Sequence, residues 1–510
     1  MGLRDVEWPS IKWPPKPNVL QLMVISFLIV SMSLSLYLDY RQYNYLKTIT
    51  YPVEFMNDKY ISEEKWVKAV DMKRTYLIIG FVYEIFDKFI DIFIVLFGLL
   101  PWLWSQVPNA IYSTVIKDSS RPIRAEVYRT ACFMLAISII NVLIKLPFQI
   151  INALIRDEAF MKLFEIFFSL PLSLYIGFSI SLLFYKVIIS LWHHFGALIL
   201  AIKIPLTLAL VFVFEIVHAL LTSFKFGIFK ALGDDEFGRG AKELATKLGY
   251  KPTNITIFKF SNVVNAYCLA SFIPWFDRIV FFKGILDIMT PEQLLAVLAH
   301  ELGHWFHSHS SKATLFGLTA EVMLAVAFFY LCKRPILKAL GFEQDLRIPQ
   351  SIETPTESKQ VDCEKQAEGE DVVKQESTEN HQIKEKAPPQ LTKDQQKEQS
   401  IYKSKLGPFI LFSIAFSYLM MPFNDAFGYL MTLDTHLSER QADVFGVQKR
   451  GKASMLSCQY ALHRPRDDEK SYSDAGVSEP FYDHLTRTHP TLLNRLRYIE
   501  ATPEQASGAL

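Results

Sequence analysis

The stretch Leu294–Lys312 reads LLAVLAHELGHWFHSHSSK and passes from an apolar run, through His-Glu-Leu-Gly-His, into a polar run. It holds four of the chain's 12 histidines within ten positions. Just before it, Thr290-Pro291-Glu292 supplies a helix N-cap, a proline at the first helical position and an acid in the first turn. We therefore expect a helix over 291–305, and its surroundings decide what the histidines can do.

The composition of the whole chain indicates a membrane protein. Half of the 510 residues are hydrophobic, 14% are aromatic and the mean hydropathy is +0.18, whereas a soluble enzyme of this length is normally net hydrophilic. A formal net charge of +1 argues against a nucleic-acid partner. The five cysteines form no CxxC, so they predict neither a disulfide framework nor a thiolate metal site. We expect a monomer that is embedded in a lipid bilayer.

Seven apolar segments are long enough to cross that bilayer. They are Val19–Leu38, Tyr76–Trp104, Ala131–Leu154, Leu163–Trp192, Phe195–Leu220, Ala313–Cys332 and Pro408–Met431. The first lacks a small-residue cleavage site, so we interpret it as a retained anchor. The region 163–220 is the hardest to divide, because only His193 and His194 separate two long apolar runs. The first two loops have similar Lys and Arg densities, which leaves the orientation open.

The second of these spans carries Glu84, Asp87, Lys88 and Asp91 on one helical face. Charge inside a membrane is costly unless it is paired or faces water. Two interpretations follow: pairing along the helix, or a polar, water-filled space enclosed by the helices. Charged residues in other spans favour the second interpretation; they are Lys145, Lys186, Lys203, Glu215, Glu321 and Asp425.

Two regions differ from the membrane segments. Residues 221–310 predict a folded α/β insertion, with strands within 251–260 and 277–286 and helices within 236–250 and 291–305. Residues 351–400 contain no aromatic residue and are rich in Glu, Lys and Gln, a composition that cannot bury a core. We expect a disordered loop there, with a solvated charged helix as the alternative.

The His-Glu-x-x-His pattern is the candidate motif for metal binding and catalysis. Residues four apart share a helical face, so His300 and His304 can offer ring nitrogens to one metal ion. Glu301 is turned by about 100° from His300 and is better placed to hold a water beside that ion. A catalytic zinc needs a third protein ligand and an open position. Glu439, in HLSERQADVFG, can supply that ligand, and Asp443, one turn later, can orient a ligand histidine.

An ordinary surface role for Glu439 is the competing interpretation. Such a carboxylate would pair with a cation one helical turn away. No Lys or Arg lies three or four positions from Glu439, which weakens this alternative.

The order of these motifs resembles that of the type I CAAX prenyl endopeptidases, the a-factor-converting integral-membrane zinc proteases. The matching features are AHELGHW followed by His309, an ExxAD motif after one further span, and HPTLLNRL at His489–Leu496. The seven spans also agree. The resemblance implies a mainly α, polytopic membrane protein whose helices form a barrel around a water-filled chamber, with a small zincin-like α/β catalytic domain. The chain departs from the family pattern at Lys283, where an Asp is usual.

The resemblance also implies a function. His300, His304 and Glu439 would bind one Zn2+ per chain, and Glu301 would be the general base. The family removes the C-terminal tripeptide of prenylated CaaX proteins, and some members make a second, upstream cleavage. Prenylated CaaX peptides would then be the substrates, and the endoplasmic reticulum and inner nuclear membranes the expected locations.

Further residues take expected roles from the same resemblance. His489 would donate to the oxyanion, and Arg495 would support the site or meet a carboxylate. His309 would lie beside the site. Asn265 and Ala266, in VVNAYCL, would pair with the substrate backbone at a strand edge.

Two other functions stay open at this point. One is a membrane quality-control zinc protease, which the five spans before the motif argue against. The other is a catalytically silent scaffold of the same fold, which the intact ligand and base pattern argues against. The expected organisation is 1–220 for five transmembrane helices, 221–310 for the catalytic insertion, 311–332 for a sixth span, 333–406 for the charged loop, 407–431 for a seventh span and 432–510 for a C-terminal catalytic segment.

Overall fold

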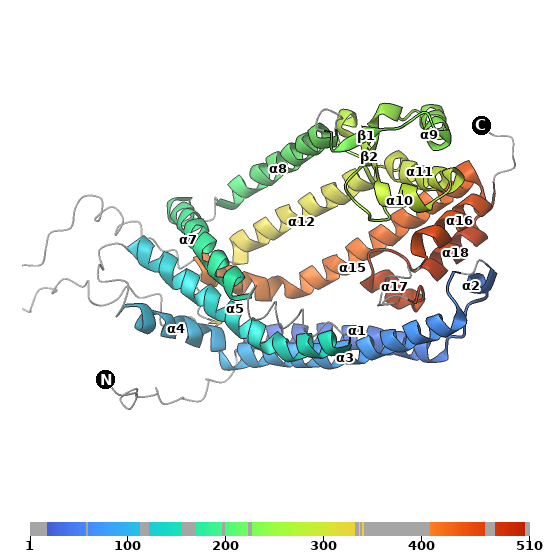
Figure 1. Ribbon diagram of the computed structural model, residues 1–510. Helices are drawn as coiled ribbons and strands as arrows, with labels where there is room; N and C mark the ends of the chain where they lie inside the picture. Colours follow the sequence, from blue (N-terminus) through green and yellow to red (C-terminus); the bar gives the residue numbers. More distant parts are fainter. Residues whose placement is uncertain are drawn as a thin grey trace, which may run out of the picture.

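The computed structural model describes residues 18–57, 60–112, 122–155, 170–195, 199–222, 227–331, 336, 339–340, 409–464 and 475–504. Within these ranges the chain is mostly helical, with one small four-stranded sheet. Figure 1 shows long helices that lead toward the sheet and a group of shorter helices beside it. The predicted loop 351–400 lies outside the described residues.

Long apolar helices make up most of the structure. They are α1 (Val19–Thr48), α3 (Glu63–Phe97), α4 (Leu99–Tyr112), α5 (Pro122–Ile155), α7 (Leu170–Phe195), α8 (Ile199–Thr222), α12 (His309–Leu331) and α15 (Phe409–Arg450). A short helix, α2 (Val53–Asn57), joins α1 to α3. In the described part, six helices are long and apolar enough to cross a membrane, and a bent pair, α3 with α4, makes a seventh. The count agrees with the seven predicted spans.

The second predicted span is broken. The axes of α3 and α4 differ by 67°. Gly98 stands between them with φ 60°, and its N–H donates to the carbonyls of Ile94 and Val95. A glycine accepts this left-handed conformation and ends a helix because no Cβ opposes it. The expected continuous span over Tyr76–Trp104 is therefore corrected to two helices that meet at Gly98.

The described part of the hard-to-divide region 163–220 contains two helices. α7 ends at Phe195 and α8 begins at Ile199. Phe195, which was expected to begin the second span, therefore belongs to the first. The start of the predicted span at 163–169 lies outside the described residues.

The sheet has the order β1-β2-β4-β3. Its strands are β1 (Phe229–Ala231), β2 (Ile255–Phe258), β3 (Ala266–Leu269) and β4 (Arg278–Phe282). The central strands β2 and β4 are parallel, and both outer pairs are antiparallel. β3 therefore lies at one edge. The 3-10 helices at Pro252–Asn254 and Pro274–Phe276 precede β2 and β4.

Strands form within both predicted ranges, but the second ends early. The chain from Lys283 to Ile288 is the short helix α10. The N–H of Gly284 donates to the carbonyl of Ser261, and a Cβ at Gly284 would lie 2.3 Å from the carbonyl oxygen of Asn262. This close approach of the preceding loop turns the chain away from the sheet. Within the predicted range 277–286, the strand therefore covers 278–282 and residues 283–286 are helical.

A buried core joins the sheet to α9 (Glu236–Lys247) and α11 (Pro291–Phe306). Ala241 on α9, Phe281 on β4 and Leu298 on α11 are all inaccessible to solvent. Burial of such side chains contributes about 1.5–3 kcal/mol each for the larger ones. This core fixes which face of α11 turns inward.

One long helix links the membrane to the catalytic end. α15 has 42 residues and crosses the expected boundary at 431/432 without a break. At 1.5 Å per residue it is about 60 Å long, twice the roughly 30 Å apolar thickness of a bilayer. Its second half therefore extends past the apolar layer. Beside that half lie α16 (Lys452–His463), α17 (Pro480–Thr486) and α18 (Leu492–Ala501).

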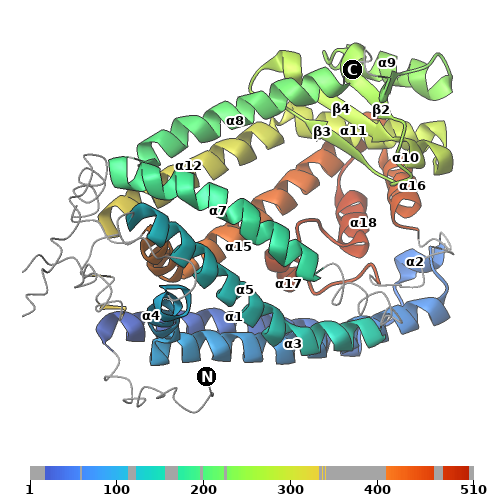
Figure 2. The ribbon, with the colours of Figure 1, turned by 60° about the vertical axis from the view of Figure 1, so that its left-hand side comes forward.

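Hydroxyl groups of α1 meet carboxylates of two other long helices. Ser35 donates to Glu84 of α3 at 2.7 Å, and Ser31 donates to Asp425 of α15 at 2.5 Å. α1 and α3 lie side by side in Figures 1 and 2. Glu84, on the polar face of the second span, thus has a hydroxyl partner on a neighbouring helix, which neither interpretation from the sequence included.

Candidate metal centre

Helix α11 carries the histidine pattern into the protein interior. The Thr290 side chain accepts from the N–H of Gln293, and the Gln293 side chain accepts from the N–H of Thr290, which is a capping box. Every residue from Ala296 to Gly303 is buried. The apolar run that precedes the motif therefore positions the histidines, because its burial takes His300 inward with it.

Helices α11 and α15 approach closely at Gly303. A Cβ added there would lie 2.9 Å from the Cα of Ala442 and 3.1 Å from the Cβ of Phe445. Real Cβ atoms do not come this close to backbone, so only glycine lets the helices cross at this distance. The crossing brings Glu439, one turn before Ala442, to the histidines.

Three side chains converge on one point: His300, His304 and Glu439. The two Nε2 atoms are 3.1 Å apart. Oxygens of the Glu439 carboxylate lie 3.5 Å from Nε2 of His300 and 3.6 Å from Nε2 of His304. Donors at about 2.0–2.2 Å from a tetrahedral zinc ion lie about 3.3–3.6 Å from one another. The two separations from the carboxylate fall in this range and the two Nε2 atoms lie about 0.2 Å closer than it, so two imidazoles and one carboxylate are placed to share one zinc ion.

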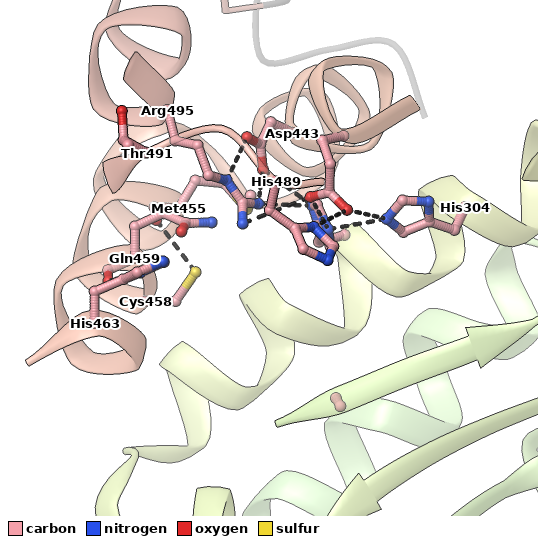
Figure 3. Close-up of polar contacts among 12 residues, drawn as sticks. His304, Asp443, Met455, Cys458, Gln459, His463, His489, Thr491 and Arg495 are labelled. Carbon is pink, nitrogen blue, oxygen red and sulfur yellow. Dashed lines mark hydrogen bonds and ion pairs between the residues drawn. The ribbon is translucent and has the colours of Figure 1, made fainter. Parts of the chain in front are cut away.

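The buried ion pair of Asp443 with Arg495 contacts His300 at Nδ1, the ring nitrogen that is not part of the convergent set. Nδ1 of His300 is 3.0 Å from Oδ1 of Asp443. Arg495 donates to both oxygens of that carboxylate, from Nη2 to Oδ1 at 2.5 Å and from Nε to Oδ2 at 3.0 Å. Figure 3 shows Asp443 and Arg495 in these contacts, close to His304 and His489. Because Nδ1–H of His300 donates to Asp443, its Nε2 keeps a lone pair for a metal ion.

The two histidines differ in their protonation. Burial, reinforced by the neighbouring His300, lowers the pKa of His304 to about 3, so His304 is neutral at pH 7. Burial also opposes charge on His300, but hydrogen bonds with Asp443 and Glu439 prevail and raise its pKa to about 10. A metal ligand has to be a neutral imidazole, so an ion that binds here displaces a proton from His300.

Glu301 lies between the two histidines in sequence but faces another direction. It is buried, and burial raises the pKa of its carboxyl group to about 7. As the residue directly after His300, it is turned from that histidine by about 100° around the helix axis. A carboxyl group that titrates near neutral pH can both take and return a proton.

The C-terminal segment brings His489 to the same site. Its Nδ1 is 3.1 Å from Oε1 of Glu439, and 66% of its side chain is exposed. The fully buried Asp483 fixes this segment by accepting from the backbone N–H and the hydroxyl of Thr491 and from the amide of Asn494. His489 is thus presented from a well-anchored loop on the open side of the cluster.

Asn265 and Ala266 lie at the sheet edge beside α11. Ala266 begins β3 and pairs with Phe281 of β4. The side chain of Asn265 accepts from the N–H of Ala266 at 2.9 Å, and its carbonyl accepts from the N–H of Phe282 at 3.1 Å. The structure therefore places Ala266 at the start of the edge strand, which packs against α11, and Asn265 just before it; neither belongs to the three convergent donors.

His309 contacts the cluster through His304, and it has a partner that the sequence did not suggest. Its Nδ1 is 2.8 Å from Nδ1 of His304, and its Nε2 is 2.9 Å from Oε1 of Gln441. Gln441 follows Glu439 by two positions. Nothing in its neighbourhood in the sequence distinguishes it, because the contact depends on how α12 leaves α11.

Two family models match the chain. Residues 42–221 match "CAAX prenyl protease N-terminal, five membrane helices", and residues 233–343, which contain α11, match "Peptidase family M48". The CAAX prenyl protease 1 of Saccharomyces cerevisiae is 23% identical over 525 aligned positions, which cover 98% of each protein. A CAAX prenyl protease 1 homolog of Arabidopsis thaliana is 24% identical over 496 positions, covering 94% of this chain and 96% of that protein.

The chain belongs to the type I CAAX prenyl endopeptidase family. It is a membrane metalloprotease. A crystal structure of S. mikatae Ste24p has the same fold, with a TM-score of 0.57 at 20% identity over 95% of this chain and 100% of that one. The predicted fold class, a mainly α membrane protein with a small α/β part, is confirmed by these matches together with the candidate spans.

Proposed function

We propose that this family member is a zinc endopeptidase that removes the C-terminal tripeptide of prenylated CaaX proteins. The observation that carries the proposal is the convergence of His300, His304 and Glu439 at the separations of a zinc coordination sphere. The curated relatives named as CAAX prenyl proteases support the substrate class.

The three convergent side chains would hold one zinc ion per chain. When bound, zinc supplies a Lewis acid and makes water acidic enough to lose a proton near neutral pH. Asp443 would keep the Nδ1 proton of His300 in place, and Arg495 would balance the charge of Asp443.

Glu301 would move the protons. Its pKa of about 7 allows it to take a proton from the attacking water and to pass it to the leaving amine. Glu301 directly follows His300 on α11, and this helix also contacts the edge strand β3, so its carboxylate would lie near both the metal ion and a bound peptide.

The edge strand β3 would bind the substrate backbone. An extended peptide that pairs with a free strand edge places its carbonyls in register along that strand. Ala266 begins this edge, and Asn265 fixes the backbone just before it. His489, on the open side of the cluster, would donate a hydrogen bond to the oxyanion that forms at the scissile carbonyl.

The membrane helices would provide the route for the lipidated end of the substrate. The polar contacts of Ser31 and Ser35 with Asp425 and Glu84 are compatible with a water-filled chamber enclosed by the spans. We place the protein in the endoplasmic reticulum membrane, where a prenylated chain and a membrane protease can meet.

A paired cleavage assay tests the proposed function. Purified zinc-loaded protein is given a farnesylated CaaX peptide and its unprenylated twin, and the released tripeptide is identified by mass spectrometry. We expect release from the farnesylated peptide and much slower release from its twin. Equal cleavage of both would favour a broad quality-control protease, and cleavage of neither by the zinc-loaded chain would contradict the proposal.

A further inference from the structure

Each candidate zinc ligand on α11 has a hydrogen-bond partner at its Nδ1 atom, and the two partners differ in charge. His300 is backed by the charged Asp443, which is paired with Arg495. His304 is backed by a second imidazole, that of His309, at 2.8 Å between the two Nδ1 atoms. Two neutral imidazoles can share a hydrogen bond only if one nitrogen carries a proton and the other does not. A further hydrogen bond therefore determines which of the two Nδ1 atoms carries the proton.

Gln441 makes that hydrogen bond, to the other ring nitrogen of His309. Its Oε1 atom is 2.9 Å from Nε2 of His309, and an amide oxygen can only accept. Nε2 of His309 therefore carries the proton of its ring, which leaves Nδ1 of His309 as an acceptor. Nδ1–H of His304 then donates to it, and Nε2 of His304 is left with a lone pair. In the opposite arrangement a proton on Nε2 of His304 would point at Glu439 and His300, where the ion has to lie.

The backbone between the two helices is bent in a way that creates this contact. Ser308, between the end of α11 and the start of α12, has φ 53°, a left-handed conformation that residues other than glycine rarely adopt. The turn places the ring of His309 edge-on against that of His304, with ring centres 5.0 Å apart. His309 is 8% exposed, whereas Gln441 is exposed on α15. The chain of contacts thus runs from the cluster to the surface of α15.

We propose that His309 and Gln441 form a hydrogen-bonded relay that fixes the tautomer of His304 for zinc binding. Both are positioning residues. This inference rests on the proposed zinc site, and it adds two side chains whose removal weakens metal binding without removing a ligand. Loss of a partner behind a metal-binding histidine typically costs about 10–100-fold in affinity.

The test measures zinc affinity of the purified full-length protein in detergent, by competition with a colorimetric chelator. His309→Leu removes the acceptor and is expected to weaken zinc binding about 10–100-fold. His309→Asn keeps a neutral acceptor oxygen near the position of Nδ1 and is expected to recover most of the affinity. His307→Leu is the matched control. The His307 ring stacks on that of His309 at 5.4 Å, so this control removes packing but no relay hydrogen bond, and its affinity should stay within about twofold of the wild type.

Gln441→Leu is expected to weaken zinc binding less, about 3–10-fold, because water can replace an exposed acceptor. In the double variant with His309→Leu, it should add nothing further, since both changes break one relay. All these variants leave the charge unchanged. Gln441 is exposed, so its variant reports on the relay even if His309→Leu fails to fold.

The possible outcomes distinguish failure of the relay from failure of the proposed function on which the relay rests. Equal losses in His309→Leu and His309→Asn, or fully additive losses in the double variant, would overturn the relay. Wild-type affinity in both His309→Leu and Gln441→Leu would do so as well, while leaving the zinc site intact. A wild-type chain that binds no zinc would contradict the proposed function itself and the relay with it.

Discussion

Helix α15 carries carboxylates in two regions with contrasting surroundings. Asp425 lies within the apolar half of the helix and accepts a hydrogen bond from the hydroxyl of Ser31 on α1. Glu439, about four turns later, lies among His300, His304, His489 and Arg495. One carboxylate is matched by a neighbouring hydroxyl. The other is matched by several nitrogen donors that converge on one point.

The difference shows which buried charges carry chemistry. A carboxylate with a hydroxyl partner is satisfied locally and has no reason to gather ligands. Around Glu439, the Nε2 atoms of two imidazoles lie 3.1 Å apart and 3.5–3.6 Å from the carboxylate oxygens, a set of donors that one zinc ion would complete. We therefore expect changes near Glu439 to affect the metal and catalysis, and changes near Asp425 to affect stability alone.

The largest effect is expected from Glu301→Gln. Glutamine has nearly the same shape but cannot take a proton, so kcat/KM for the farnesylated peptide should fall by about 10²–10⁴. The zinc content should stay that of the wild type, because Glu301 is outside the three convergent donors. Parallel kinetics and metal analysis check both parts. Zinc-loaded Glu301→Gln protein that cleaves within tenfold of the wild-type rate would remove Glu301 from the mechanism.

Asp443→Asn sharpens the comparison between the two regions. The change removes the carboxylate that pairs most closely with Arg495, while Glu439 stays 3.6 Å away, and it weakens the hydrogen bond at Nδ1 of His300. We expect zinc affinity to fall about 10–100-fold in a chelator competition. Asp425→Asn makes the same chemical change in the apolar half of α15 and should leave zinc affinity unaltered. Similar losses in both variants would show that overall negative charge, rather than position, governs metal binding.

Gly303→Ala tests whether the helix crossing creates the site. The new Cβ would lie 2.9 Å from the Cα of Ala442, so α11 and α15 must separate. We expect a loss of about 1–3 kcal/mol in stability, with weaker zinc binding, because Glu439 moves with α15. The control is Gly317→Ala on α12, where a Cβ meets nothing within 4 Å. Melting temperatures in detergent should fall only in the first variant, and equal changes in the two would argue against the close crossing.

The smallest effect is expected from Ser35→Ala. It removes the 2.7 Å hydrogen bond from α1 to Glu84. Interhelical hydrogen bonds of this kind contribute about 0.6 kcal/mol within membranes. The melting temperature should fall slightly and the zinc content should not change. Loss of zinc in this variant would link the two regions more tightly than the contacts suggest.

The sequence predicted the parts of the site that depend on helical periodicity. His300, Glu301 and His304 lie on one helix, so their relation follows from local geometry. Glu439 was identified by its motif and by the missing cation nearby, and the structure brings it to the two histidines. Their roles as ligands and base stay predictions for the measurements above.

What the sequence could not predict depends on contacts between distant segments. The bend at Gly98 needs the backbone conformation of that residue, which many glycines in helices do not adopt. The continuity of α15 across 431/432 was hidden because its composition changes there from apolar to polar while the helix continues. Gln441 was missed because its partner His309 reaches it only through the strained turn at Ser308.

The zinc content of the purified chain tests the central claim most directly. Metal analysis of wild-type protein and of Glu439→Ala, both exchanged into metal-free buffer after equal exposure to zinc, compares the complete donor set with one that lacks its carboxylate. We predict one zinc per chain in the wild type and a large loss in the variant. A wild-type chain without zinc, or a variant that keeps a full equivalent, would contradict joint binding by α11 and α15.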